Sequence, residues 1–442
     1  MLLVLEIFTA LAGSRLLFLE AIKNRFHNFA TSTFLLCFVP LLCIYPVIAR
    51  IAVGGAYSVR PGDLQVIDDP FVYLVYQMFC LGILLSVFIS QRNYNRRKSS
   101  PVKLRNQNYK MGTLAIAAFI AIIFGGVYLY VYSTGFSAAY LISATRFEWF
   151  KNANYSPVAY VISSYLIALS PVVLLLALQN KRHWWVVAVV ILALAFFGLM
   201  SKDRKWLIFI LSAFFAYVYF KNQFSIVVRP KIVALGFVFV TVLAFWQVGR
   251  SVIFDYILSG SGDIVYNSQQ MAINLLTRGD LPYYYNASIT AIYINLHFDY
   301  NIPFGILRRQ LLFFLPASYS FGLKIEDISA LFSDAIGAGD SVRRGNMPPG
   351  LFGLFVLSFG WIGGIATCSM LPFAFRAIDR VIQRNRGGAA IVFASHMLSS
   401  TMLLLRGDDS SATYFMVSSF VMLYVIWAFD LASRPKVPSI RI

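Results

Sequence analysis

Apolar runs recur along the whole 442-residue chain, and they constrain its fold more than any other feature. A membrane-spanning helix needs about 17–25 predominantly apolar residues. Charged residues make up only 13% of the sequence and the mean hydropathy is +0.70, whereas a soluble domain carries roughly a quarter charged residues. The sequence therefore predicts an all-α polytopic membrane protein with about 11 (10–14) transmembrane helices, in a single integral membrane domain, 1–442. The expected spans lie near 2–19, 30–54, 70–90, 111–133, 156–178, 184–200, 206–220, 232–249, 351–375, 388–405 and 413–432.

Lysine and arginine gather in every second connection between these runs, including 92–110, 376–386 and the last residues of the chain. Cytoplasmic loops of membrane proteins carry such an excess of bases. These connections are therefore predicted to be cytoplasmic, which places the C-terminus inside and the N-terminus outside. The net charge of +18 is then a topological bias and not the footprint of a nucleic-acid partner.

The connection 250–350 falls on the opposite, external side. A loop of about a hundred residues is far longer than usual, and such loops are commonly functional. Its stretches Ile289–Leu296 and Phe304–Leu315 are amphipathic and predict segments at the membrane interface. We interpret 250–350 as an external cap that carries the active site.

Arginines stand on the predicted external side against the general bias. Arginine offers a planar fork of donors that matches phosphate oxygens, so this set is a candidate site for a lipid-linked phosphate or pyrophosphate. Ion pairing with nearby acids is the alternative for each of them, and Arg308 and Arg309 could also reach lipid headgroups. The candidate anion-binding residues are Arg204, Arg250, Arg278, Arg308, Arg309, Arg343 and Arg344.

Two external stretches combine these arginines with other polar groups. Arg278 is followed by Asp280, Tyr283 and Asn286, a mixture that could grip a sugar ring or, alternatively, anchor an interfacial aromatic belt. The second stretch, 337–350, is rich in glycine and contains Asp340 and Asn346 before the Pro-Pro-Gly that opens the next apolar run. Backbone N–H groups at such a helix start favour an anion.

The candidate general bases on this side are Asp280, Asp340 and His297, and the residues alone do not choose among them. The four histidines are scattered, no metal-ligand spacing occurs, and no nucleotide-binding loop is found. We therefore expect no metal and no other cofactor.

The segment 303–363 resembles the oligosaccharide repeat unit polymerases, the Wzy-type O-antigen polymerases of bacteria. The pattern consists of Pro303-Phe-Gly, an apolar run ending in Leu315-Pro316, then Asn346-Met-Pro-Pro-Gly-Leu-Phe-Gly353, and finally Ser358-Phe-Gly-Trp-Ile-Gly363. The turn 201–205 also resembles an arginine-bearing turn of that family, with Arg204 at the arginine. Two positions depart from the family: Ala317 follows Pro316 where an arginine is frequent, and Leu354 replaces an acid.

The resemblance implies a GT-C-like fold in the bacterial inner membrane and a glycosyltransferase that works on the periplasmic face. It would polymerise undecaprenyl-pyrophosphate-linked oligosaccharide repeat units into an O-antigen-like surface polysaccharide. Arg278, Asp280 and Asp340 would then be catalytic, and the remaining arginines, Tyr283, Asn286 and Asn346 would bind the pyrophosphate or the sugars. The implied partners are the lipid-linked oligosaccharide, membrane lipids and a separate chain-length regulator protein.

Two alternatives stay open at this point. A ligase-like transferase, which moves the finished glycan to another acceptor, would share the arginine-rich external face. A flippase or transporter of the lipid-linked unit would be expected to show internal symmetry and charges near the bilayer midplane. The sequence has no internal repeat, and the runs 111–133, 156–178, 184–200 and 232–249 contain no acid, which disfavours the transporter.

Overall fold

The computed structural model describes about half of the expected external cap and most of the apolar runs before it. All the secondary structure of these residues is helical. The described residues are 2–23, 29–47, 69–95, 113–143, 169–179, 184–201, 205–221, 280–312, 319–325, 327–336 and 348–384, with scattered positions in 159–167 and 401–407.

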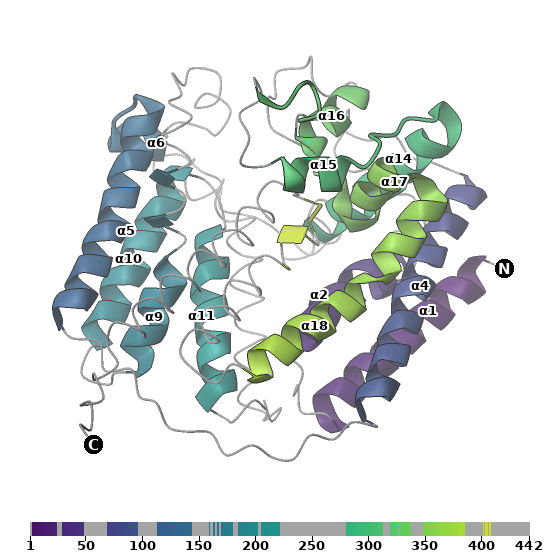
Figure 1. The fold of residues 1–442 in the computed structure, drawn as a ribbon, viewed down its shortest axis with the longest axis horizontal. Helices are drawn as coiled ribbons and strands as arrows, with labels where there is room; N and C mark the ends of the chain where they lie inside the picture. The colour runs from purple at the N-terminus through teal and green to yellow at the C-terminus, as the bar shows by residue number, and fades with distance from the viewer. Residues whose placement is uncertain are drawn as a thin grey trace, which may run out of the picture.

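The helices form two groups that stand side by side in Figure 1, each around its own apolar core. The first group combines the start of the chain with its later part: α1 (Leu2–Phe18), η1 (Leu19–Lys23), α2 (Phe29–Phe38), η2 (Val39–Ile44), α4 (Pro70–Asn95), α14 (Asp280–Phe298), α15 (Gly305–Leu311), α16 (Ile328–Ala335), α17 (Gly350–Ser369) and α18 (Leu371–Arg384). The second group comes from the middle of the chain: α5 (Thr113–Thr134), α6 (Ala138–Ser143), α9 (Ser170–Gln179), α10 (Trp184–Ser201) and α11 (Lys205–Lys221). Sequence neighbours therefore pack together in the second group, whereas the first depends on long-range contacts.

Local chemistry explains where several helices begin. Pro70 opens α4, a position that suits proline because the first N–H of a helix has no helical partner, and the Asp69 carboxylate accepts from the Phe71 N–H at 2.8 Å. Asp327 caps α16 in the same way by accepting from the Ser329 N–H at 2.9 Å. The π-helix η2 contains Pro40, which has no N–H to donate within the helix.

The closest helix pair is formed by α14 and α17, which run parallel to each other. Gly350 lies against Ser288 and the Tyr284 carbonyl, and one turn further a Cβ atom on Gly353 would stand 2.7 Å from that of Ala291. Small residues allow two backbones to approach in this way inside a membrane protein. This pair, with α15 and α16, occupies one end of the first group, the upper end in Figure 1.

The protein has the features of a membrane protein. Four described helical stretches are long and apolar enough to cross a bilayer, Leu2–Ile22, Pro70–Gln91, Trp184–Ser201 and Gly350–Arg380, and Ile120–Thr134 and Ile210–Tyr219 are shorter apolar helices. Many large apolar side chains on α1, α4 and α10 are exposed, as expected where lipid is the surrounding solvent. The expected spans 232–249 and 413–432, and all but a few positions of 388–405, lie outside the described residues, so the number of about 11 spans stays a prediction.

The interior of the first group contains charged side chains that the sequence did not reveal. Glu20 accepts from Ser32 Oγ at 2.7 Å and from Gln91 Nε2 at 3.1 Å. Asp379 is 2% exposed and caps α2 by accepting from the backbone N–H groups of Ala30 and Thr31 at 2.6 and 3.1 Å. Arg376, which the charge distribution assigned to a cytoplasmic connection, is only 4% exposed on α18 and lies one turn before Asp379.

Candidate functional site

The most unusual backbone of the described chain is a break inside α17. Gly360 has φ 69° and ψ 173°, so the helix is interrupted between Phe359 and Trp361. A break of this kind leaves nearby backbone carbonyl groups without their usual helical N–H donors. The carbonyls of Leu357 and Ser358 accept hydrogen bonds from the N–H groups of Ile302 and Phe304.

Residues 302–306 are thus fixed to the first half of α17. The two backbone bonds measure 2.6 Å from Ile302 to Leu357 and 2.9 Å from Phe304 to Ser358. The Ser358 hydroxyl also accepts from the Ile306 N–H at 3.2 Å. Non-helical backbone in a membrane protein is tolerated where other protein groups satisfy it, and here the start of α15 does so. The two segments with the strongest sequence pattern, 303–305 and 358–363, therefore lie in direct contact.

Arg308 and Arg309 follow directly on α15 and have partners within the protein. Arg308 donates to the carbonyls of Leu323 and Gly322, at 2.9 and 3.4 Å. Arg309 donates to the Ile325 carbonyl at 3.2 Å and lies 3.7 Å from the Asp327 carboxylate. The ion-pairing alternative therefore fits Arg309, whereas Arg308 bonds backbone carbonyls. Together they fasten residues 322, 323, 325 and 327 to α15. Their binding of an anion stays a prediction.

The aromatic stretch after Arg278 is helical. α14 begins at Asp280, whose side chain lies outside the described part of the chain, and Tyr283 and Asn286 stand in its first two turns. Both side chains are partly buried, and the Asn286 amide nitrogen is shielded from solvent. Tyr285, between them, is 3% exposed and packs edge-on against Tyr76. The segment is therefore part of a packed helix, whereas the sequence predicts that it belongs to an external loop.

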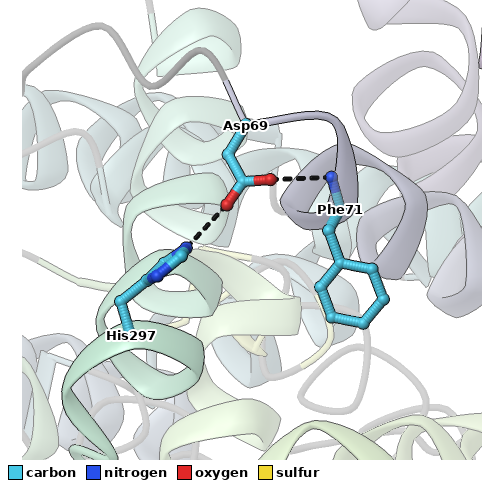
Figure 2. A network of polar contacts seen from close by, with 3 residues as sticks. All are labelled: Asp69, Phe71 and His297. Atoms are coloured by element: carbon cyan, nitrogen blue, oxygen red, sulfur yellow. Dashed lines mark hydrogen bonds and ion pairs between the residues drawn. The ribbon is translucent and has the colours of Figure 1, made fainter.

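His297, the third candidate base, makes a close polar contact with Asp69 at the other end of α14. Its Nε2 lies 2.6 Å from Oδ2 of Asp69, while Oδ1 of the same carboxylate caps α4 (Figure 2). The side chains of His297 and Asp69 are 46% and 22% exposed, and the imidazole also lies against the ring of Tyr293 at 4.6 Å. The hydrogen bond from His297 lowers the pKa of Asp69 below its usual value.

An aspartate that holds an imidazole by one nitrogen leaves the other nitrogen free to exchange a proton. This arrangement is chemically suited to a general base that a carboxylate orients. It also has a structural explanation, since a carboxylate at the start of α4 and a histidine at the end of α14 both match the helix dipoles.

Several predicted site residues lie outside the described residues, and nothing follows about their geometry. They are Arg204, Arg250, Arg278, Asp340, Arg343, Arg344 and Asn346. Among the residues that are described, no group of three or more histidine, cysteine or acidic side chains could hold a metal ion.

Sequence reasoning missed Asp69 as a residue of this region, and it noted Ser358 only as part of the family pattern. Asp69 could have been noticed as an acid directly before a proline at the start of an apolar run, the usual pattern of a helix cap. Nothing local to position 69 indicates a contact with a histidine 228 residues away.

Comparisons with known protein families, with curated proteins and with solved structures found no match to this chain.

Proposed function

We propose that this protein is a membrane glycosyltransferase that polymerises undecaprenyl-pyrophosphate-linked oligosaccharide repeat units. It would act on the periplasmic face of a bacterial inner membrane, within a GT-C-like helical fold. The growing glycan leaves its pyrophosphate carrier and joins a sugar hydroxyl of another lipid-linked unit.

The observation that carries the proposal is the contact between 302–306 and 357–360. Two parts of the sequence pattern of the polymerase family, Pro303-Phe-Gly and the start of Ser358…Gly363, lie in these two segments, and hydrogen bonds join the segments at the break in α17. A pattern split over two distant segments is more informative when the segments form one structural unit. This support comes from the chain's own sequence and geometry.

The chemistry asks for positive charge and for a base. As the glycosidic bond to the carrier breaks, negative charge develops on the departing pyrophosphate, and preorganised arginines would stabilise it. Arg278 is the first candidate for this role, and Arg204, Arg343 and Arg344 are further candidates. Asp280, Asp340 or His297 would accept the proton of the attacking hydroxyl.

The test compares glycan ladders from cells that lack the gene and carry either the wild type, Arg278→Ala or Arg380→Ala. Arg380 is an exposed arginine on α18, at the end predicted to be cytoplasmic, and it serves as the matched control. We expect deletion to leave a single repeat unit on the acceptor and Arg278→Ala to lower polymerisation by about 10²–10³ at normal expression. Arg380→Ala should restore the full ladder.

Other outcomes point to the alternatives. Full-length glycan that accumulates on undecaprenyl pyrophosphate would indicate a ligase-like transferase. Lipid-linked units trapped in the cytoplasm would indicate a flippase. One observation favours the flippase: Glu6, Glu20, Arg376 and Asp379 are buried among the helices of the first group. Charged groups inside a membrane domain are commonly functional, so their burial weakens the sequence argument against a transporter.

A further inference from the structure

The short helix α15 and the segment 319–325 form one unit in the described part of the predicted cap. Arg308 holds the segment by its bonds to the carbonyls of Gly322 and Leu323, and Arg309 holds it by a bond to the Ile325 carbonyl. On the other side, Ile306 and Gly305 of α15 are buried against α17. The unit is therefore fastened both internally and to the helical core.

This unit exposes a set of large apolar side chains, here named the cap patch. Leu307 and Leu311 are four residues apart and therefore lie on one face of α15, and Phe304 directly precedes this helix at its N-cap. Phe321 and Leu311 are the most exposed of the set, at 94% and 78%. The cap patch consists of Phe304, Leu307, Leu311, Tyr319, Phe321 and Leu323.

The backbone at the tip of the segment holds Phe321 outward. Phe321 has φ 49° and Gly322 has φ 75°, both in the left-handed region. Such a conformation is unfavourable for a bulky residue, and it persists where surrounding contacts impose it. Here the carbonyls of residues 322 and 323 are bonded to Arg308. An ordered turn thus presents a fully exposed phenylalanine, and water is a poor environment for it.

The cap patch continues into the apolar surface of the membrane-spanning helices. The ring of Phe304 lies edge-on to Phe359 of α17 at 6.1 Å, and Trp361, just after the break, contacts Phe71 of α4 at the same separation. Phe71 and Ile362 are themselves exposed, on helices long and apolar enough to cross a bilayer. The same surrounding medium that covers these helices would therefore reach the cap patch.

We propose that the cap patch is embedded in the membrane, with membrane lipid as its partner. α15 lies along the bilayer surface and Phe321 reaches into the boundary between headgroups and acyl chains, about 5–10 Å deep as in other interfacial helices. The hydrogen bonds of Arg308 and Arg309 hold the inserted turn in place. This role is independent of the glycosyltransferase activity proposed above, because it concerns only how this part of the chain meets the bilayer.

The test places a spin label on Phe321→Cys and measures its accessibility to oxygen and to a water-soluble nickel chelate in the full chain reconstituted into phospholipid nanodiscs. Ala335→Cys is the matched control, because Ala335 is exposed on the neighbouring α16 beside the exposed Asp334. Leu311→Cys is a second test position in case Phe321→Cys does not fold. The wild-type chain measures the background from its four cysteines, of which Cys43, Cys80 and Cys368 are buried.

We expect the ratio of oxygen to nickel accessibility to be several-fold higher at position 321 and at position 311 than at position 335. Equal ratios at all three positions would show that the cap patch faces water and would overturn the proposal. Labels at 321 and 311 that are shielded from both reagents would show protein, and not lipid, on the cap patch, which would overturn it as well.

Discussion

At the scale of single residues, Gly360 decides the course of α17. The combination of φ 69° and ψ 173° lies in a region that only glycine adopts readily. A Cβ atom added at this position would meet no heavy atom within 4 Å. The requirement for glycine is therefore purely conformational, and the break in the helix depends on it.

We predict that Gly360→Ala destabilises the protein by about 1–3 kcal/mol and loosens the contact between α15 and α17. The matched control is Gly125→Ala, since Gly125 lies in α5 with equally open space and no positive φ. Alanine is the better helix former, so the control should be neutral or stabilising by up to about 1 kcal/mol. Thermal unfolding in detergent measures both, and equal effects of the two changes would contradict the conformational explanation.

At the scale of elements, the end of α14 is joined to the start of α4 by one polar contact. His297 and Asp69 meet at 2.6 Å across these two helix ends. The contact lowers the pKa of Asp69, because the hydrogen bond from His297 favours the ionised carboxylate. A lowered pKa in the folded state means that the contact stabilises the protein where the carboxylate is charged.

We predict that Asp69→Asn lowers the free energy of unfolding at neutral pH by about 0.2–1 kcal/mol, the range for an exposed charged pair. Asparagine keeps an oxygen for the Phe71 N–H but loses the charge opposite His297. The stabilisation of the wild type is complete above the usual pKa of 3.8 and is lost as the pH falls through the lower folded value. Unfolding of both proteins as a function of pH checks this.

Asp299→Asn is the control for this pair, because Asp299 is exposed and asparagine tolerates its left-handed backbone. It should match the wild type at every pH. A gap between Asp69→Asn and the wild type that stays constant down to pH values below 3.8 would contradict the assignment.

At the scale of the whole molecule, α14, α15 and α16 lie at one end of the first helical group, and α18 runs towards the other end (Figure 1). The distribution of lysine and arginine predicts that the first end is external and the second cytoplasmic. Asp334 on α16 and Arg380 on α18 are exposed at these two ends, so they report on the orientation directly.

We predict that a membrane-impermeant maleimide labels Asp334→Cys in intact spheroplasts and labels Arg380→Cys only after the membrane is opened. The described native cysteines are buried, and the wild type measures their background. Labelling of Arg380→Cys in intact spheroplasts, with Asp334→Cys protected, would show the opposite orientation. It would contradict the external location that the proposed function requires.

The sequence alone was enough to place many of the helices. α1, α4, α5, α10 and α11 each coincide with an expected span within a few residues. The reason is physical: in lipid every backbone polar group must be satisfied within its own helix, so the bilayer thickness sets the length of each apolar run. The start of α17 at Gly350, directly after two prolines, was predictable on similarly local grounds.

Only the tertiary structure decided which distant groups meet. The run 351–375 contains no charged residue. Its break at Gly360 becomes tolerable because the N–H groups of Ile302 and Phe304 reach α17 from another part of the chain. The burial of Asp379 depends likewise on the start of α2, whose N–H groups it caps. A polar group in an apolar interior needs a partner, but the spacing of residues along the chain does not specify which one arrives. The local apolar pattern therefore determined the helices, and hydrogen bonding between remote segments determined the site.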